Sequence, residues 1–219
     1  MKRFIISMTL AAVCLCSCDL TPDILYRAML FGDMQGETVF RADDNCTYHF
    51  TNITASAGLP TSGRLLAYFD VRKQVEGTEN EFEATLNDYR IPIVKDPVLC
   101  LNKAEEIALG YNEIRFDNGT ISGGYLNTQC TILRETELHG EPNVNLQLMK
   151  APDASSDTLH FVLRYNSGKD VVADFTTDIA DVTFYACFPI ADLLFTDKKT
   201  VVEVKWLWDG TWNKACTTI

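Results

Sequence analysis

The chain of 219 residues has few of the groups that acid–base catalysis and nucleic-acid binding require. It contains three histidines, and 19 Lys and Arg side chains stand against 30 Asp and Glu side chains, for a formal net charge of −11. Histidine is the usual proton carrier near neutral pH. Phosphate backbones are bound mainly by clustered Lys and Arg. The composition therefore argues against nucleic acid as a partner and offers little for proton transfer.

Motifs for nucleophilic, phosphate and metal chemistry are also missing from the sequence. It has no Gly-x-Ser-x-Gly elbow, no Ser-x-x-Lys pair and no glycine-rich phosphate loop. His49, His139 and His160 are widely separated, and no two of them form a His-x-x-x-His pair. We therefore expect no enzyme, no metal site and no cofactor. A pair of carboxylates assembled from distant positions, as in glycosidases, is an alternative that the sequence leaves open.

A long apolar run occurs only at the N-terminus. Lys2 and Arg3 precede an apolar stretch, Phe4–Leu15, and Leu15-Cys16-Ser17-Cys18 follows with small residues before a cysteine. This order is typical of a lipoprotein signal, and the stretch is shorter than the ~20 residues that span a bilayer. The pattern predicts that residues 1–17 are cleaved and that Cys18 carries lipid. An ordinary signal peptide with incidental cysteines is the alternative.

The predicted mature chain is an acidic protein of the cell envelope. Without Lys2 and Arg3 it keeps 17 basic against 30 acidic side chains, a formal charge of about −13. Such a surface repels anionic polymers and keeps the protein soluble. We expect anchoring in the outer membrane rather than the inner one. Residues 19–23 contain no convincing acidic export cluster, so the face of the membrane stays open.

Few cysteines remain for disulfides once the signal is removed. Cys14 and Cys16 leave with it and Cys18 is lipidated, which leaves Cys46, Cys100, Cys130, Cys187 and Cys216. An odd number leaves at least one thiol unpaired, and none of the five belongs to a Cys-x-x-Cys motif. We predict that most are small buried apolar residues. A bridge between Cys187 and Cys216 is an open alternative.

The residue pattern predicts a mainly β protein with one short helix. Strands are expected at 38–42, 46–51, 64–71 and 81–93, and at several short segments beyond residue 111. Pro97 to Gly110 is the one helical stretch, because Pro97 suits a first turn and Gly110 a helix end. Asp117-Asn118-Gly119 is predicted to be a turn, and Asp209-Gly210 a two-residue hairpin turn. The helix between two groups of strands predicts a domain boundary near Gly110.

Three tryptophans near the C-terminus are the main candidate ligand-facing residues. Trp206, Trp208 and Trp212 bracket the Asp209-Gly210 turn, and Trp206 and Trp208 share a face of the predicted strand. Exposed on one face, such rings can stack on sugars; packed inward, they close a sandwich core. We favour the core interpretation, with glycan binding as the alternative.

Four segments resemble motifs of the NigD-like family of exported lipoproteins. Ser62-Gly63-Arg64-Leu65 resembles its Gly-x-Arg/Lys-apolar strand, and Gly124-Tyr125-Leu126-Asn127 its Tyr-Leu-Asn segment. Phe161 to Asp170 is similar to its Phe-Arg-His-Asn-x-x-Gly-Asp turn, with Tyr165 in place of the histidine and Lys169 inserted before Asp170. Val182-Thr183-Phe184 resembles the Val-Ser-Phe strand that follows. If Tyr165 only braces a turn, it can replace the histidine.

The resemblance implies an architecture and a location more than a mechanism. It implies an N-terminal OB-type barrel followed by a C-terminal immunoglobulin-like β-sandwich, which we assign to residues 18–110 and 111–219. OB barrels bind oligonucleotides or oligosaccharides, and the acidity argues against the first. We expect a lipid-anchored, non-catalytic interaction or structural module, as part of an envelope protein complex. A glycan-binding lipoprotein that uses exposed aromatic rings for an oligosaccharide is the alternative.

Overall fold

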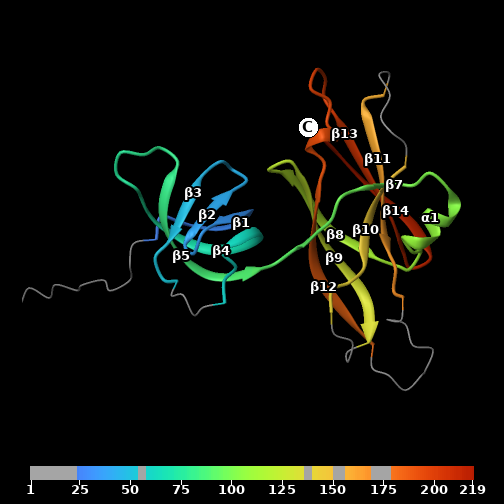
Figure 1. The fold of residues 1–219 in the computed structure, drawn as a ribbon, viewed down its shortest axis with the longest axis horizontal. Helices are drawn as coiled ribbons and strands as arrows, with labels where there is room; N and C mark the ends of the chain where they lie inside the picture. The colour runs from blue at the N-terminus through green and yellow to red at the C-terminus, as the bar shows by residue number, and fades with distance from the viewer. Residues whose placement is uncertain (1–23, 54–57, 136–139, 150–155, 169–178) are drawn as a thin grey trace, which may run out of the picture.

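The computed structural model describes residues 24–53, 58–135, 140–149, 156–168 and 179–219, and it is built almost wholly from β-strands. Figure 1 shows a barrel at one end of the molecule and a sandwich of two sheets at the other. The mainly β class, with a barrel before a sandwich, is therefore confirmed. Among the described residues, no helix is long and apolar enough to cross a membrane.

The barrel contains the first five strands. They are β1 (Tyr26–Gln35), β2 (Val39–Ala42), β3 (Thr47–Phe50), β4 (Ser62–Gln74) and β5 (Glu81–Arg90). The strands follow the order β1-β2-β3-β5-β4, and β4 closes the barrel by pairing antiparallel with β1. β3 and β5 run parallel, and the other neighbours antiparallel. This order and closure are those of the predicted OB-type barrel.

The sandwich contains two sheets whose strands come from distant parts of the chain. One sheet has the order β6-β12-β9-β8, with β6 (Ile93–Val94), β12 (Ile179–Pro189), β9 (Tyr125–Glu135) and β8 (Arg115–Ser122). The other has the order β14-β13-β11-β10-β7, with β14 (Thr211–Thr218), β13 (Val201–Trp208), β11 (Thr158–Tyr165), β10 (Val144–Leu148) and β7 (Val98–Leu99). A 3-10 turn, η1, covers Ala191–Leu193. The first sheet faces the barrel, and α1 lies beside the second (Figure 1).

Each part has its own hydrophobic core, as alternating strands require. The barrel core is rich in rings, with Phe69 in contact with Phe40, Phe50 and Tyr48 at centroid distances of 4.5–6.0 Å. The sandwich core is mostly aliphatic and includes the buried Phe161 and Phe188. Separate cores indicate two units that could each fold around their own apolar residues.

The division between the two parts falls earlier than the predicted boundary at Gly110. β6 pairs with β12 through Ile93 and Ala186, and β7 pairs with β10 through Leu99 and Leu148. Residues 93–110 therefore belong to the sandwich, and the last barrel strand ends at Arg90. The sequence did not indicate this, because two-residue strands have no recognisable alternation and their partners lie far along the chain.

The one α-helix exists but is shorter than predicted. α1 spans Lys103–Ala108, and Asn102 caps it by accepting a hydrogen bond from the Glu105 amide. Glu105 in turn accepts from the Leu101 amide, which completes a reciprocal cap. Pro97 is not a first-turn residue, because the chain directly after it extends into β7. The start of the helix is marked by Asn102, a preferred N-cap residue, and not by Pro97.

Two glycine-containing segments that were both predicted to be turns behave differently. Asp209 and Gly210 have φ of 51° and 66° and join β13 to β14 as a two-residue hairpin, which confirms that turn. The predicted turn at Asp117-Asn118-Gly119 is wrong. These residues lie inside β8, where the register with β9 shifts between Phe116 and Asn118. A bulge and a turn favour similar residues, which explains the error.

Candidate functional site

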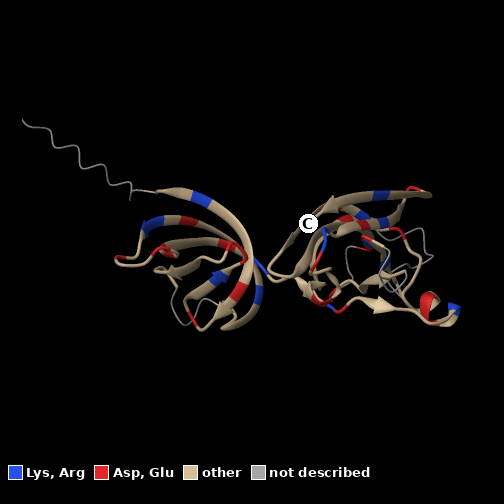
Figure 2. Ribbon diagram, turned by 90° about the horizontal axis from the view of Figure 1, so that it is seen from above, with Lys and Arg blue, Asp and Glu red and all other residues tan. Residues whose placement is uncertain are grey.

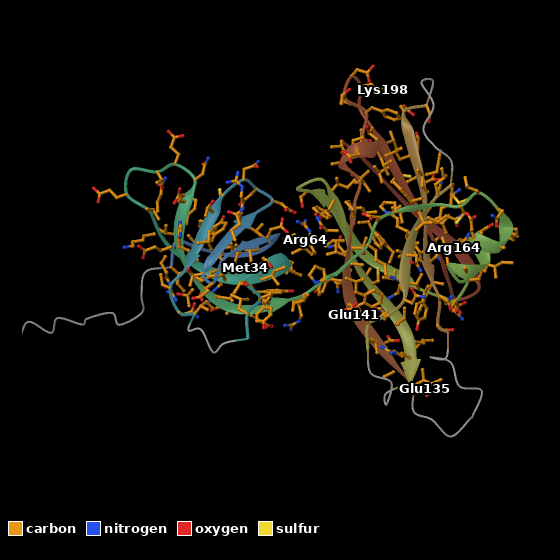
Figure 3. The ribbon with its side chains drawn as sticks, viewed as in Figure 1. Met34, Arg64, Glu135, Glu141, Arg164 and Lys198 are labelled. Atoms are coloured by element: carbon orange, nitrogen blue, oxygen red, sulfur yellow. The ribbon has the colours of Figure 1, made fainter. Side chains whose placement is uncertain are left out.

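The first candidate site is a buried polar cluster between barrel and sandwich. Arg64 on β4 is 5% exposed and points toward the sandwich (Figure 3). Its Nη2 donates to Asp43 Oδ2 at 2.6 Å and to Asn127 Oδ1 at 2.8 Å. Its Nη1 donates to Asp43 Oδ1 at 3.1 Å, and its guanidinium stacks 3.9 Å from the centre of the Tyr125 ring. Arg64 thus binds barrel and sandwich residues at once.

The carboxylate of Asp43 extends this cluster across the same junction. Ser122 Oγ donates to Asp43 Oδ2 at 2.6 Å, and Asn127 Nδ2 donates to Ser122 Oγ at 2.9 Å. Burial lowers the pKa of Arg64, but its hydrogen bonds and charge attraction to Asp43 outweigh burial and raise it overall. We call these five residues the Arg64 joint: Asp43, Arg64, Ser122, Tyr125 and Asn127. An arginine that is paired with a carboxylate and donates from all three guanidinium nitrogens is suited to fixing two units together.

Two of the segments that carry the family resemblance meet in this joint. Arg64 comes from the Gly-x-Arg segment, and Tyr125 and Asn127 come from the Tyr-Leu-Asn segment. Sequence reasoning identified both segments but gave no sign that they touch. A cleft beside the joint lies between Phe31 and Leu66 of the barrel and Tyr185 of the sandwich, with a volume of about 110 Å³. This is below the ~300 Å³ of typical small-molecule pockets.

The second candidate site surrounds Arg164 on the outer face of the second sheet. Arg164 is 4% exposed; its Nε donates to Gln147 Oε1 at 2.9 Å, and its Nη2 to Glu106 Oε1 of α1 at 2.8 Å. Its guanidinium lies 4.5 Å from the Tyr111 ring centre and 5.5 Å from that of Trp212. Nη1 is buried and has no hydrogen-bond partner among the described residues. We call this the Arg164 centre.

Next to Arg164, Tyr165 takes the position where the family resemblance has a histidine. It is 1% exposed and packs in the sandwich core, while its backbone carbonyl accepts from the Asn112 amide at 3.0 Å. Gly110, with φ of +90°, passes so close to this carbonyl that a side chain there would clash. Tyr165 therefore supports the segment after α1 as part of the core.

The three tryptophans do not form a shared platform. Trp206 packs against the sandwich core, and its ring centre lies 5.1 Å from that of Phe116. The guanidinium carbon of Arg115 lies 5.2 Å from the ring centre of Trp208. Trp212 is 52% exposed and pairs with Leu207, so it lies on the opposite face of the sheet from Trp206 and Trp208. The expectation of core packing fits Trp206. It is wrong for Trp212.

Two of the three histidines form salt bridges with carboxylates. His160 Nδ1 lies 3.0 Å from Glu203 Oε1, and Lys214 Nζ 3.1 Å from Glu203 Oε2. Hydrogen bonds from His160, Lys214 and Lys205 lower the pKa of Glu203 to about 2. His49 Nε2 lies 3.0 Å from Glu81 Oε2. His139 lies outside the described residues. Each of the two described imidazoles thus has a ring nitrogen within hydrogen-bonding distance of a carboxylate.

The five cysteines in the described part of the chain are free thiols, so the alternative of a Cys187–Cys216 bridge is wrong. Cys187 is buried toward the barrel, whereas Cys216 is exposed on the other sheet. Burial raises the pKa of Cys130 to about 12 and that of Cys187 to about 11, which keeps both thiols protonated. Among the described residues no group of His, Cys, Asp and Glu side chains has a metal-binding arrangement. Cys18 lies outside the described residues.

Comparisons with known proteins agree with this architecture. The sequence matches no protein-family model and no curated protein. A protein of unknown function from Bacteroides vulgatus has a similar structure, with a TM-score of 0.66, 17% identity, and 89% of this chain and 91% of that one covered. A NigD-like immunity protein from Bacteroides caccae aligns with a TM-score of 0.59 and 9% identity over 87% of this chain and 91% of that one.

The chain has the NigD-like fold. The structure of a lipoprotein from Bacteroides fragilis is also similar, with a TM-score of 0.52 and 12% identity, over 88% of this chain and 97% of that one. At these identities the likeness concerns the fold. The fold implied by the motifs at Arg64, Tyr125 and Arg164 is thereby confirmed.

Proposed function

We propose that the protein is a non-catalytic interaction module, anchored by lipid on Cys18 in the outer membrane and part of an envelope protein complex. One observation carries this proposal. The buried charged side chains of Arg64, Arg164 and Glu203 form ion pairs and hydrogen bonds that link one element of the fold to another. Exposed apolar side chains include Leu101 at 82% and Trp212 at 52%, and the Trp212 ring centre lies 5.5 Å from the Arg164 guanidinium. Exposed apolar side chains that form a contiguous patch are typical of interaction surfaces.

The fold likeness to a lipoprotein and to an immunity protein supports an envelope role of this kind. The glycan-binding alternative is not favoured, because Trp206, which shares a face with Trp208, packs against the sandwich core, and Trp212 lies on the opposite face. A sugar platform needs at least two rings on one accessible face.

Fractionation of intact cells tests the anchor, and chemical cross-linking in the same cells tests the complex. The wild type should sediment with membranes and give a discrete cross-linked species. Cys18→Ser should be soluble and lose that species, because an unanchored chain is diluted away from its neighbours. Cys46→Ser is the matched control, since it removes a partly exposed thiol in the barrel and should change neither result. Membrane retention of Cys18→Ser, or a soluble wild type, would contradict the proposal.

A further inference from the structure

The sandwich has four edge strands in its described part, and three of them are poor templates for a further strand. β6 and β7 are each two residues long. β8 is interrupted by the register shift between Phe116 and Asn118. Short length and bulges are the usual means by which proteins keep sheet edges from pairing with other chains. β14 is the fourth edge, with eight residues, a regular register and no proline.

The pairing of β14 with β13 defines which backbone groups are free. Thr200 and Ile219 exchange both backbone hydrogen bonds, so every second pair after them is hydrogen-bonded in the same way. The backbone N–H and C=O groups of the intervening residues point away from β13, and these residues are Trp212, Lys214, Cys216 and Thr218. In the described part of the chain no other strand pairs with them. They form a row of donors and acceptors along an exposed edge.

An apolar groove runs beside this edge, on the open side of the sandwich. It has a volume of about 110 Å³ and lies between β14, at Ala215 and Thr217, and β8, at Ile121. Val202 and Val204 from the core form part of its lining. A strand added to β14 would direct alternate side chains into this groove, because side chains in a strand alternate between two faces.

The opposite face of the same edge is basic in an otherwise acidic protein. Lys214 and Lys205 are cross-strand neighbours, 63% and 46% exposed, and His160 lies next to them through their shared contact with Glu203. Figure 2 shows acidic residues distributed over both parts of the molecule. Two lysines against one carboxylate leave a local positive charge at this place. The charge favours acidic side chains on the outward face of an added strand.

We propose that β14 is the docking edge for an extended segment of a partner protein in which aliphatic and acidic side chains alternate. The segment pairs its backbone with Trp212, Lys214, Cys216 and Thr218, places aliphatic side chains in the groove, and directs Asp or Glu toward Lys214 and Lys205. This is β-strand addition, in which main-chain hydrogen bonds provide affinity and side-chain pockets provide specificity. The inference rests on the proposed interaction role and names the kind of partner.

Peptide binding followed by NMR amide exchange tests the inference. The probes are capped nine-residue peptides, one of alternating valine and glutamate and one of alternating valine and lysine. The glutamate peptide should bind and slow exchange at Trp212, Lys214, Cys216 and Thr218, whereas Ala215 and Thr217 are already protected by β13. Equal binding of both peptides, or protection elsewhere, would overturn the inference. Concentration-dependent protection of the same amides without peptide would show that a second copy occupies the edge.

Substitutions in β14 distinguish the contribution of backbone hydrogen bonds to peptide binding from that of side-chain charge. Cys216→Pro removes an outward N–H that β13 does not use, so it should abolish peptide binding while the fold persists. Cys216→Ala keeps the N–H and should bind normally. Lys214→Glu should weaken binding of the glutamate peptide about tenfold and strengthen binding of the lysine peptide. Failure of these tests leaves the anchoring of Cys18 untouched, because fractionation and cross-linking do not depend on which surface binds.

Discussion

The Arg64 joint and the Arg164 centre are built from the same parts but are completed differently. Each holds a buried arginine against a carboxylate, a side-chain amide and an aromatic ring. In the joint, each nitrogen of the guanidinium has an acceptor, and its partners come from two different parts of the fold. In the Arg164 centre, Nη1 has no acceptor among the described residues, and the partners come from α1, from Tyr111 after it, and from β10 and β14 of one sheet.

The difference shows how the surroundings of a buried charge decide its effect on stability. A buried arginine with all donors paired can stabilise a contact, whereas an unpaired buried donor costs about 1–3 kcal/mol. The Asp43 side chain is 9% exposed, while that of Glu106 is 22% exposed and therefore better solvated. Loss of Arg64 should consequently matter more than loss of Arg164.

The largest expected effect is that of Arg64→Met. The substitution leaves Asp43 buried without its cation, and removal of one partner of a buried pair costs about 3–5 kcal/mol. We expect this loss in the free energy of unfolding, measured by denaturant titration. We also expect the single transition to split in two, because barrel and sandwich have separate cores and lose their shared contact.

Limited proteolysis provides the second readout for Arg64→Met. The variant should be cleaved near Ile91, which is 63% exposed and joins the last barrel strand to β6. Early cleavage at Gly110–Gly119 instead would favour the boundary predicted from the sequence. An Arg64→Met protein that unfolds in one transition at wild-type denaturant concentration would show that the joint contributes nothing.

The tryptophans on the two faces of the sheet give the next largest contrast. Trp206→Ala removes a ring that packs against the core and should cost about 3 kcal/mol, at the lower end for a large aromatic because Trp206 is partly exposed. Trp212→Ala is the matched control on the opposite face and should change stability by less than about 1 kcal/mol. Thermal unfolding of both variants checks this. Equal losses would mean that Trp212 is needed to cover Arg164.

A smaller effect is expected for Arg164→Met. It removes the unpaired Nη1 but leaves Gln147 without its donor, so the net loss should be about 1–2 kcal/mol. Arg164→Lys should not restore the wild type, because an ammonium cannot match the planar contacts to Tyr111, Glu106 and Gln147. Chemical denaturation of the two variants provides the measurement. A loss as large as that of Arg64→Met would remove the distinction between the two sites.

The smallest effect concerns acid stability through Glu203. Its pKa is lowered from 4.5 to about 2, so this carboxylate stabilises the fold at pH values above its unfolded pKa. The contribution is lost as the pH falls from about 4.5 toward 2. Glu203→Gln should therefore be less stable than the wild type at pH 6, and the difference should shrink below pH 4. A constant difference across this range would contradict the assignment.

The sequence predicted the types of secondary structure better than the residues at which the elements and domains begin and end. Alternation and the Asp209-Gly210 turn predicted strands and a hairpin correctly, because both are local patterns. β6 and β7 were missed because their existence depends on partners such as Ala186 that lie far along the chain. The same applies to the sites. Arg64, Tyr125 and Arg164 stood in the resembling motifs, but only packing brings Arg64 against Asn127 and Arg164 beneath Trp212.

The pairing of β6 with β12 has a consequence for the order in which the two parts fold. All five barrel strands lie before residue 91, so the barrel can close without any residue of the sandwich. The sandwich must wait for Ala186 and Cys187, which pair with Ile93 and Val94. Such distant pairing is intrinsically slow. Until the sandwich forms, the Arg64 side chain is solvated beside Asp43. Packing of Tyr125 and Asn127 against the barrel then removes this water.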